Sequence, residues 1–295
     1  MSAVAVRPAA GPLMSHVSRS RRVKDRAFTA ALWICGGLAM LPLLFISAYV
    51  IVKGAAALNI SFFTQSPAPP GVPDQGIAPA LIGSAMIVGM ATLFAVPLGL
   101  LAAVYLAEYG TGRLAAAIRF VADMLLSTPS IIAGAFIWAV VVLTLGQFSA
   151  LAGALALTVL MWPLITRATE EILRLVPQEL REAGLALGVP RWKVILRVVI
   201  PTAGAGIFTA VMLAMARGLG ETAPILLTAL GNDFVNTNIL QPTDAVPLRI
   251  YNYARSPYPD YHAIGWGAAL VLLVVVLTLS ITARILSSRQ QRRTR

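Results

Sequence analysis

The chain has 295 residues, of which 58% are hydrophobic and only 12% are charged, and its mean hydropathy is +0.80. A soluble globular protein carries about a quarter charged residues, so this composition excludes a soluble enzyme and indicates a polytopic membrane protein. The net charge of +11 is better explained by basic residues on the cytoplasmic side of membrane spans than by nucleic-acid binding.

Long uncharged stretches predict an all-α membrane protein with six transmembrane helices. A basic arm over residues 1–26 precedes a membrane domain over 27–286, and a basic tail over 287–295 follows it. The uncharged run over 124–166 is too long for one helix of about 20 residues, so we place a break near Gly146. The expected spans cover residues 27–52, 77–107, 124–145, 150–166, 202–231 and 263–283.

The distribution of Lys and Arg predicts the orientation of these spans. With both termini in the cytoplasm, the inner segments 1–26, 109–123, 167–201 and 284–295 hold six, two, six and five basic residues. The outer segments 53–76 and 232–262 hold three of the 23. Positive charge collects on the cytoplasmic side, so we expect both termini to be cytoplasmic.

The inner segment 167–201 has the pattern of two short helices. Pro177 suits the start of the first helix, Gly188 suits its left-handed C-terminus, and Pro190 and Pro201 suit the start and end of the second. Three interpretations are open: a solvated loop on the membrane surface, a DNA-binding helix-turn-helix, and an element that docks a cytoplasmic partner. Its place between two spans argues against DNA binding.

The spacing within this segment resembles the EAA loop of ABC importer permeases. That pattern is Glu-Ala-Ala, three residues, Gly, nine residues, Ile, one residue and Leu-Pro. Here Gly184, Val198 and Ile200 replace the second Ala, the Ile and the Leu. The resemblance implies a type I ABC importer permease fold and a coupling helix that sits on an ATPase. The residues that would couple to the ATPase are Glu182, Ala183, Gly184, Gly188 and Pro201.

Further passages resemble the permeases of bacterial phosphate ABC importers. The run Arg217–Pro224 is the most specific of them to the phosphate branch. The resemblance implies a substrate-pathway role for Arg217, Glu221 and Thr222. The other matching passages are Gly76–Gly83, Pro97–Gly99, Ala107–Tyr109 and Thr128–Ile132.

The residues of this run also indicate a pathway on physical grounds. Arg217 lies 13 residues beyond Gly204, about 20 Å along a helix and thus near mid-membrane. An ionised side chain there costs at least about 2.5–3.5 kcal/mol and is normally interior and functional. Glu221 is one turn further on the same face of a continuous helix, so a buried ion pair that only fixes helix packing is the alternative.

The resemblance implies partners and a location in the bacterial inner membrane. The implied partners are two copies of an ATPase, a paralogous permease that forms a heterodimer with this chain, and an extracytoplasmic phosphate-binding protein. No lysine follows a glycine, so the sequence lacks the phosphate-binding loop of an ATPase, and ATP would be used by the partner subunit. We expect no cofactor, no nucleic-acid partner and no metal, because His16 and His262 are isolated.

Three other functions fit parts of the sequence. A permease for another oxyanion, such as sulfate or molybdate, would carry the same features. An ion-coupled secondary transporter would keep the intramembrane charges but has no need of the coupling loop. A membrane receptor or assembly scaffold would need neither feature.

Overall fold

The computed structural model describes residues 19–293, so part of the predicted basic arm, including His16, and the last two residues of the tail lie outside it. Every regular element within this range is helical. The elements are α1 (Arg19–Ala55), α2 (Ile60–Thr64), α3 (Ala78–Val104), η1 (Tyr105–Tyr109), α4 (Arg113–Ser127), α5 (Ser130–Ile137), η2 (Trp138–Val142), α6 (Leu143–Leu145), α7 (Ala150–Arg174), α8 (Gln178–Ala186), α9 (Arg191–Val194), η3 (Ile195–Val199), α10 (Ile200–Leu219), α11 (Ala223–Thr228), α12 (Val246–Ala254) and α13 (Pro259–Arg293).

The chain divides into two units, Met1–Tyr49 and Val50–Arg295. The described part of the first unit is the larger portion of α1. Its apolar side chains are exposed, with Trp33 79% and Phe45 72% accessible. A long helix that exposes apolar side chains on all faces fits a lipid environment, where the helix itself satisfies every backbone polar group.

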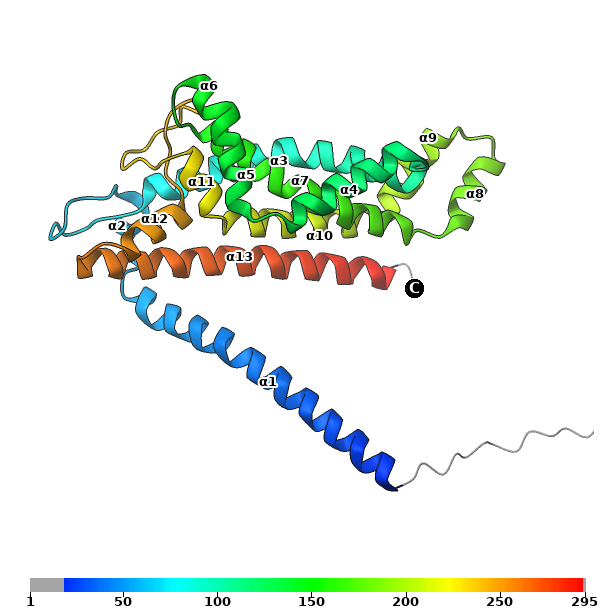
Figure 1. The fold of residues 1–295 in the computed structure, drawn as a ribbon, viewed down its shortest axis with the longest axis horizontal. Coiled ribbons are helices and arrows are strands. Elements are labelled where there is room, and N and C mark those ends of the chain that lie inside the picture. The colour runs from blue at the N-terminus through cyan, green and yellow to red at the C-terminus, as the bar shows by residue number, and fades with distance from the viewer. Residues whose placement is uncertain (1–18, 294–295) are drawn as a thin grey trace, which may run out of the picture. The chain divides into compact units, whose positions relative to one another are not determined.

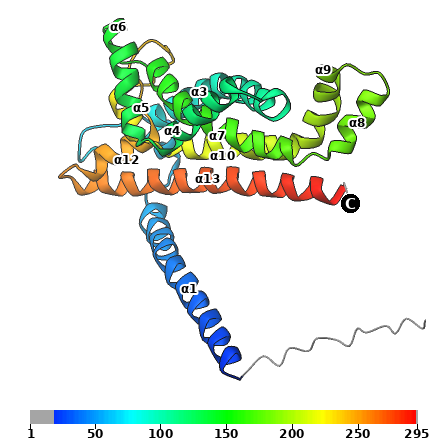
Figure 2. The ribbon, with the colours of Figure 1, turned by 45° about the vertical axis from the view of Figure 1, so that its right-hand side comes forward.

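The core of the second unit is built on the packing of α3 against α7, with α10 lying between α7 and α13 (Figures 1 and 2). Small residues allow the helices to approach closely. A Cβ atom on Gly99 of α3 would lie 2.8 Å from the Ile165 side chain of α7, so only glycine fits this contact. Other buried members of the core are Ile87, Leu157, Met161, Ile225 and Leu248.

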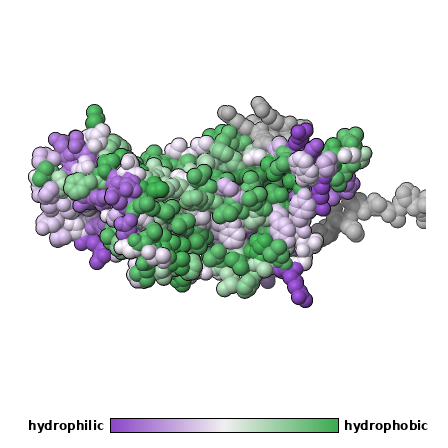
Figure 3. Space-filling model, turned by 90° about the horizontal axis from the view of Figure 1, so that it is seen from above, coloured by the Kyte–Doolittle hydropathy of each residue, from purple (hydrophilic) through white to green (hydrophobic). Residues whose placement is uncertain are grey.

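The second unit has polar segments at its two ends. Helices α8 and α9 lie at one end, whereas α6 and α12 lie at the other (Figures 1 and 2). On the face drawn in Figure 3, hydrophobic residues occupy the middle and hydrophilic residues gather at both ends. This division fits a molecule whose middle lies in hydrocarbon and whose ends face water.

Five helices of the described residues are long and apolar enough to cross a membrane, and a bent pair brings the number to six. The pair is Arg113–Ser127 followed by Ser130–Leu145, with an angle of 107° between them. The prediction of one straight span over 124–145 with a polar segment over 109–123 is therefore wrong. Pro129 causes the break, because the residue before a proline avoids helical geometry, and Thr128 is extended with ψ 134°.

Two further helix boundaries differ from the predictions. The expected span 202–231 is interrupted, because α10 ends at Leu219 and α11 begins at Ala223. Conversely, Pro201 does not end a helix, since a continuous helix runs from Arg191 to Leu219. The π-helical turn η3 directly precedes this proline, and the Ile200 amide bonds the Ile195 carbonyl five residues back. Pro201 has no backbone N–H to donate, and the changed hydrogen-bond register before it allows the helix to continue without that bond.

Candidate functional site

The candidate pathway residues lie where α10 breaks, at its junction with α11. Arg217 is in the last turn of α10, and its Nε atom lies 3.7 Å from Oε1 of Glu221. The guanidinium side chain is 51% exposed, whereas the carboxylate is 16% exposed. Glu221 lies beyond the helix end, so the expectation that Arg217 and Glu221 share one face of a continuous helix is wrong. The two side chains nevertheless meet, because the chain turns tightly here.

Local backbone bonds explain the turn after Arg217. The amide of Gly220 donates to the Arg217 carbonyl at 3.0 Å, and the amide of Glu221 donates to the Gly218 carbonyl at 3.2 Å. Thr222 is the N-cap of α11 and is half-buried, and Pro224 follows in the first turn. A Cβ on Gly134 of α5 would lie 2.6 Å from Pro224 Cα, so α5 packs directly on the break. The break is thus held in place by a neighbouring helix.

Gly188 ends the candidate coupling helix α8 with the backbone geometry that its sequence position predicts. Its φ is +75°, the left-handed conformation that glycine adopts most readily. The Gly188 amide donates to the Leu185 carbonyl at 2.9 Å, and the Val189 amide donates to the Gly184 carbonyl at 3.2 Å. These two bonds form a Schellman motif, which satisfies carbonyls at the end of the helix.

The helix α8 presents its predicted coupling residues to solvent. Glu182 and Ala183 are exposed, and none of the nine residues of α8 is buried. Gly184 faces α9, because a Cβ there would lie 2.9 Å from Cγ2 of Val194. This contact explains why glycine replaces the second alanine of the EAA pattern. Leu187, just beyond the helix, is 83% exposed and adds apolar surface beside Glu182.

A cluster of ion pairs at the same end joins α4 to α7, and the sequence analysis missed it. Glu170 is 1% exposed and accepts hydrogen bonds from Arg119 at 2.8 Å, Arg167 at 2.6 Å and Arg174 at 2.7 Å. Arg167 also pairs with Asp123 of α4 at 2.9 Å. The spacing of Arg167 and Arg174 around Glu170 on one helix was the available signal.

A second buried ionic cluster lies at the opposite end. Asp244 is buried, and its Oδ2 atom accepts a hydrogen bond from Nε of Arg249 at 2.6 Å and lies 2.6 Å from Nη2 of the same arginine. Asp233, which is 62% exposed, lies 2.7 Å from Nη1 of the same arginine. Burial raises the pKa of Asp244 to about 6, although the Arg249 charge and its hydrogen bonds act in the opposite direction. Nothing in the sequence spacing singled out this cluster.

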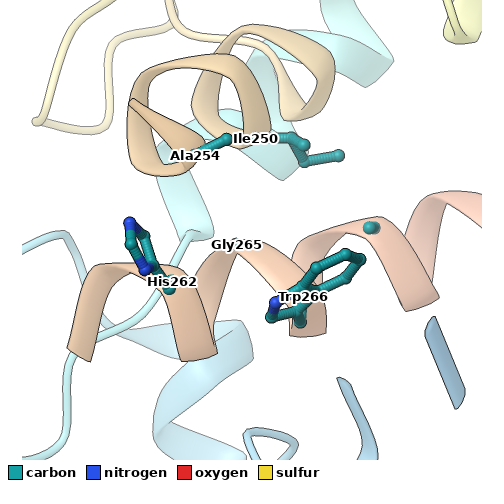
Figure 4. A pocket seen from close by; sticks show the side chains of 6 residues that line it. Ile250, Ala254, His262, Gly265 and Trp266 are labelled. Atoms are coloured by element: carbon teal, nitrogen blue, oxygen red, sulfur yellow. The ribbon is translucent and has the colours of Figure 1, made fainter. Parts of the chain in front are cut away.

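An apolar pocket of about 210 Å³ lies between α12 and α13 (Figure 4). It is distinct from the candidate pathway, because no residue of the Arg217 turn lines it. Within the described residues, no group of three His, Cys, Asp or Glu side chains is arranged to hold a metal ion. The pocket is lined by Ile250, Ala254, His262, Gly265, Trp266 and Ala269.

The fold resembles those of known ABC importers. The chain superposes on a MetNI methionine ABC transporter in an inward-facing conformation, with a TM-score of 0.57, 20% identity and coverage of 72% of this chain and 96% of that one. It also superposes on a bacterial ABC transporter that imports the acidic polysaccharide alginate, with a TM-score of 0.58, 15% identity and coverage of 92% and 98%. These similarities establish the type I ABC importer permease fold.

The fold, together with the family to which the chain belongs, defines the class, an inner membrane permease of an ABC importer, which is a transport subunit and not an enzyme. Residues 95–295 match the model of the family described as "Binding-protein-dependent transport system inner membrane component", and the chain belongs to this family. As a member, it works in the inner membrane with an ATPase and a binding protein.

Relatives with a narrower description cover most of the chain. It is 45% identical over 244 residues to the "Phosphate transport system permease protein PstA" of Xylella fastidiosa, which covers 82% of this chain and 85% of that protein. The PstA of Haemophilus influenzae is 46% identical, with coverage of 80% and 84%. PstA 1 of Mycobacterium tuberculosis is 41% identical over 280 residues, with coverage of 92% and 91%.

Proposed function

We propose that this chain is the permease subunit of an ATP-driven importer that moves inorganic phosphate across the bacterial inner membrane. The observation that carries the proposal is 45% identity, over 82% of the chain, to a phosphate transport system permease. In alternating access, closure of the ATPase pair would move α8, and the permease pair would open toward one side and then the other. No bond in the transported phosphate is broken.

The full complex that we propose contains more than this chain. It has two copies of the ATPase, a paralogous permease that pairs with this chain, and an extracytoplasmic binding protein specific for phosphate. The exposed residues of α8 support the ATPase contact, because Glu182 and Ala183 lie away from the contacts that Arg181 and Gly184 make within the chain. Glu182 would offer a carboxylate to a basic group, and Ala183 would allow close approach.

We assign the phosphate pathway to Arg217, Glu221 and Thr222. A dianion cannot cross a purely apolar wall, and a guanidinium group suits the oxygen atoms of phosphate. The side chain of Arg217 is half exposed, and its ion pair with Glu221 is long at 3.7 Å, so its donors are available to an anion. A break between two helices also exposes backbone polar groups, as in other transport pathways.

Uptake by cells that lack their own phosphate importer tests this function. The chain is expressed together with the permease, ATPase and binding protein that are encoded by adjacent genes. The uptake of labelled phosphate, sulfate and molybdate is then compared. We expect ATP-dependent uptake of phosphate alone. Uptake of sulfate or molybdate in preference to phosphate would favour the other oxyanion importers.

A second measurement separates the importer from an ion-coupled transporter. Inactivation of the ATPase subunit should abolish uptake in an ABC importer while the membrane potential is intact. Uptake that persists without the ATPase, and that stops when the ion gradient is collapsed, would contradict the proposal.

A further inference from the structure

The π-helical turn η1, at the end of α3, is bound by arginines from three other elements. Arg119 of α4 donates from Nη2 to the Leu106 carbonyl at 3.0 Å, and Arg191 of α9 donates to the Glu108 carbonyl. Arg181 of α8 donates to Oε1 of Glu108 from Nε at 3.0 Å and from Nη2 at 2.8 Å. A π-helical turn alters the backbone hydrogen-bond register, which leaves carbonyls open to such donors.

Glu108 and Arg181 form the most buried tie between α8 and the membrane helices. The Glu108 side chain is 3% exposed and that of Arg181 is 13% exposed. Arg181 also donates from Nη2 to the carbonyl of Leu173, which lies near the end of α7, at 2.8 Å. No residue of α8 is buried, so its apolar packing is limited to contacts such as that of Gly184 with Val194. The ion pair therefore adds a buried polar link between α8 and η1 to this limited packing.

Helix α3 connects this tie to the opposite end of the second unit. It packs along α7 through the core, and a Cβ on Gly83 near its start would clash with the Asp244 carbonyl. The chain from Ala78 to Tyr109 is one continuous helical span. A displacement of α8 that reaches Glu108 is thus delivered to a continuous helix whose other end contacts the segment that carries Asp244.

We propose that Glu108 is a positioning residue that passes movement of the coupling helix α8 to the span α3, through its ion pair with Arg181. This inference rests on the proposed function of α8 as the contact with the ATPase. A buried carboxylate held by two donors of one guanidinium fixes orientation as well as distance. An open cavity of about 560 Å³, lined by Glu108, Arg181 and Arg191, lies beside the pair and gives it room to shift.

The test measures movement of α3 by cysteine labelling, in the complete complex reconstituted in proteoliposomes. Cys35 is replaced by Ser, and Ile82, an exposed residue near the start of α3, is replaced by Cys as a reporter. In the otherwise unchanged protein, the rate of maleimide labelling at position 82 should change when ATP is added. Glu108→Gln should reduce that change by about tenfold, the scale of effects along coupled networks, while ATP hydrolysis continues. Phosphate taken up per ATP hydrolysed should fall with it.

Two further variants distinguish transmission from folding. Arg181→Lys keeps the buried charge but loses the planar fork, so we expect an intermediate effect on both readouts. Glu171→Gln, an exposed carboxylate on α7 that lies outside the proposed ATPase contact, should leave both unchanged. An unaltered labelling response in Glu108→Gln would overturn the proposal. So would loss of assembly with the ATPase in both Glu108→Gln and Arg181→Lys, since the pair would then serve folding only.

The reporter also separates this inference from the proposed function. The labelling response to ATP is measured without transported substrate. If the unchanged complex responds to ATP but takes up no phosphate, the assigned substrate is wrong. The comparison of labelling between Glu108→Gln and the unchanged complex still decides whether Glu108 passes movement from α8 to α3.

Discussion

At the scale of single residues, the helix break at Arg217 combines an exposed guanidinium with a loosely held carboxylate. A separation of 3.7 Å between Nε and Oε1 is at the outer limit of an ion pair, and the arginine is half exposed. A pair that only stabilised packing would be expected to be shorter and more buried, as Glu170 is with its three arginines. The comparison within one molecule favours a role for Arg217 toward an anion.

Replacement of Arg217 by Gln should abolish phosphate uptake with little change in membrane insertion. Glu221 would then face the pathway without its partner and would repel an anion or take up a proton. Arg217→Lys should restore uptake only in part, because an ammonium group lacks the planar fork that suits phosphate.

The double variant Arg217→Gln with Glu221→Gln decides whether this ion pair serves the transported anion or only the packing of the helices. If the charge serves the substrate, this variant should assemble with its ATPase and remain inactive in uptake of labelled phosphate. Substantial recovery of uptake would show that transport needs neither charge, and the pair would then have only a packing role.

Gly188 allows the contribution of backbone geometry to be separated from that of side-chain size. Leucine at φ +75° carries a strain of about 1–2 kcal/mol, so Gly188→Leu should distort the end of α8 and reduce both ATPase co-purification and uptake. Apart from the two chain neighbours, no atom of the described residues lies within 4 Å of a Cβ at this position, so the Cβ itself meets no clash. Gly188→Asn is the matched control, because Asn tolerates the left-handed conformation. Normal uptake by Gly188→Leu at a normal protein level would count against the docking role.

At the scale of elements, sequence periodicity and charge predicted most of the helices but not where they bend. The starts of α3 and α7 and the turn at Gly146 follow from local signals: uncharged runs and a glycine with φ +69°. The bend at Pro129 and the break after Leu219 could not be placed, because a proline inside an apolar run can be tolerated, kinked or broken. Neighbouring helices decide which occurs, as the contact of Gly134 with Pro224 illustrates.

Helix α12 is anchored by a carboxyl group whose charge depends on pH. The pKa of Asp244 is raised from 3.8 to about 6 in the folded protein, so the folded state binds this proton more tightly than the unfolded state. The contribution to stability is complete below pH 3.8 and is lost as the pH rises through about 6. A shift of this size corresponds to about 3 kcal/mol.

Thermal unfolding in detergent at pH 4.5 and 7.5 tests this dependence. Relative to Asp244→Asn, the unchanged protein should be more stable at the lower pH than at the higher pH. Asp233→Asn removes the exposed partner of Arg249 and should lower the pH at which this stability is lost only slightly, because the Asp233 charge is the smallest of the causes that shift the pKa of Asp244. Parallel pH profiles for Asp244→Asn and the unchanged protein would show that Asp244 does not cause the effect.

At the scale of the whole molecule, the ends of the second unit differ in their charge and in their contacts. The end that carries α8 also holds Glu170 and Glu108, each bound by arginines, and the loop 167–201 contributes six basic residues. The other end contains the Asp244 cluster and the long segment between α11 and α12. The positive-inside rule assigns the α8 end to the cytoplasm, where the ATPase is, and this assignment remains a prediction.

Labelling of single cysteines in intact cells tests the topology. In a Cys35→Ser background, Thr237→Cys, in the exposed segment before α12, should react with a membrane-impermeant maleimide. Glu182→Cys on α8 should react only after the membrane is permeabilised, since we place it in the cytoplasm. Both positions are solvent-exposed in the structure, so a difference in labelling reports the side of the membrane and not burial. Reaction at position 182 in intact cells would place α8 outside, where no ATPase could reach it, and would remove the physical basis for coupling.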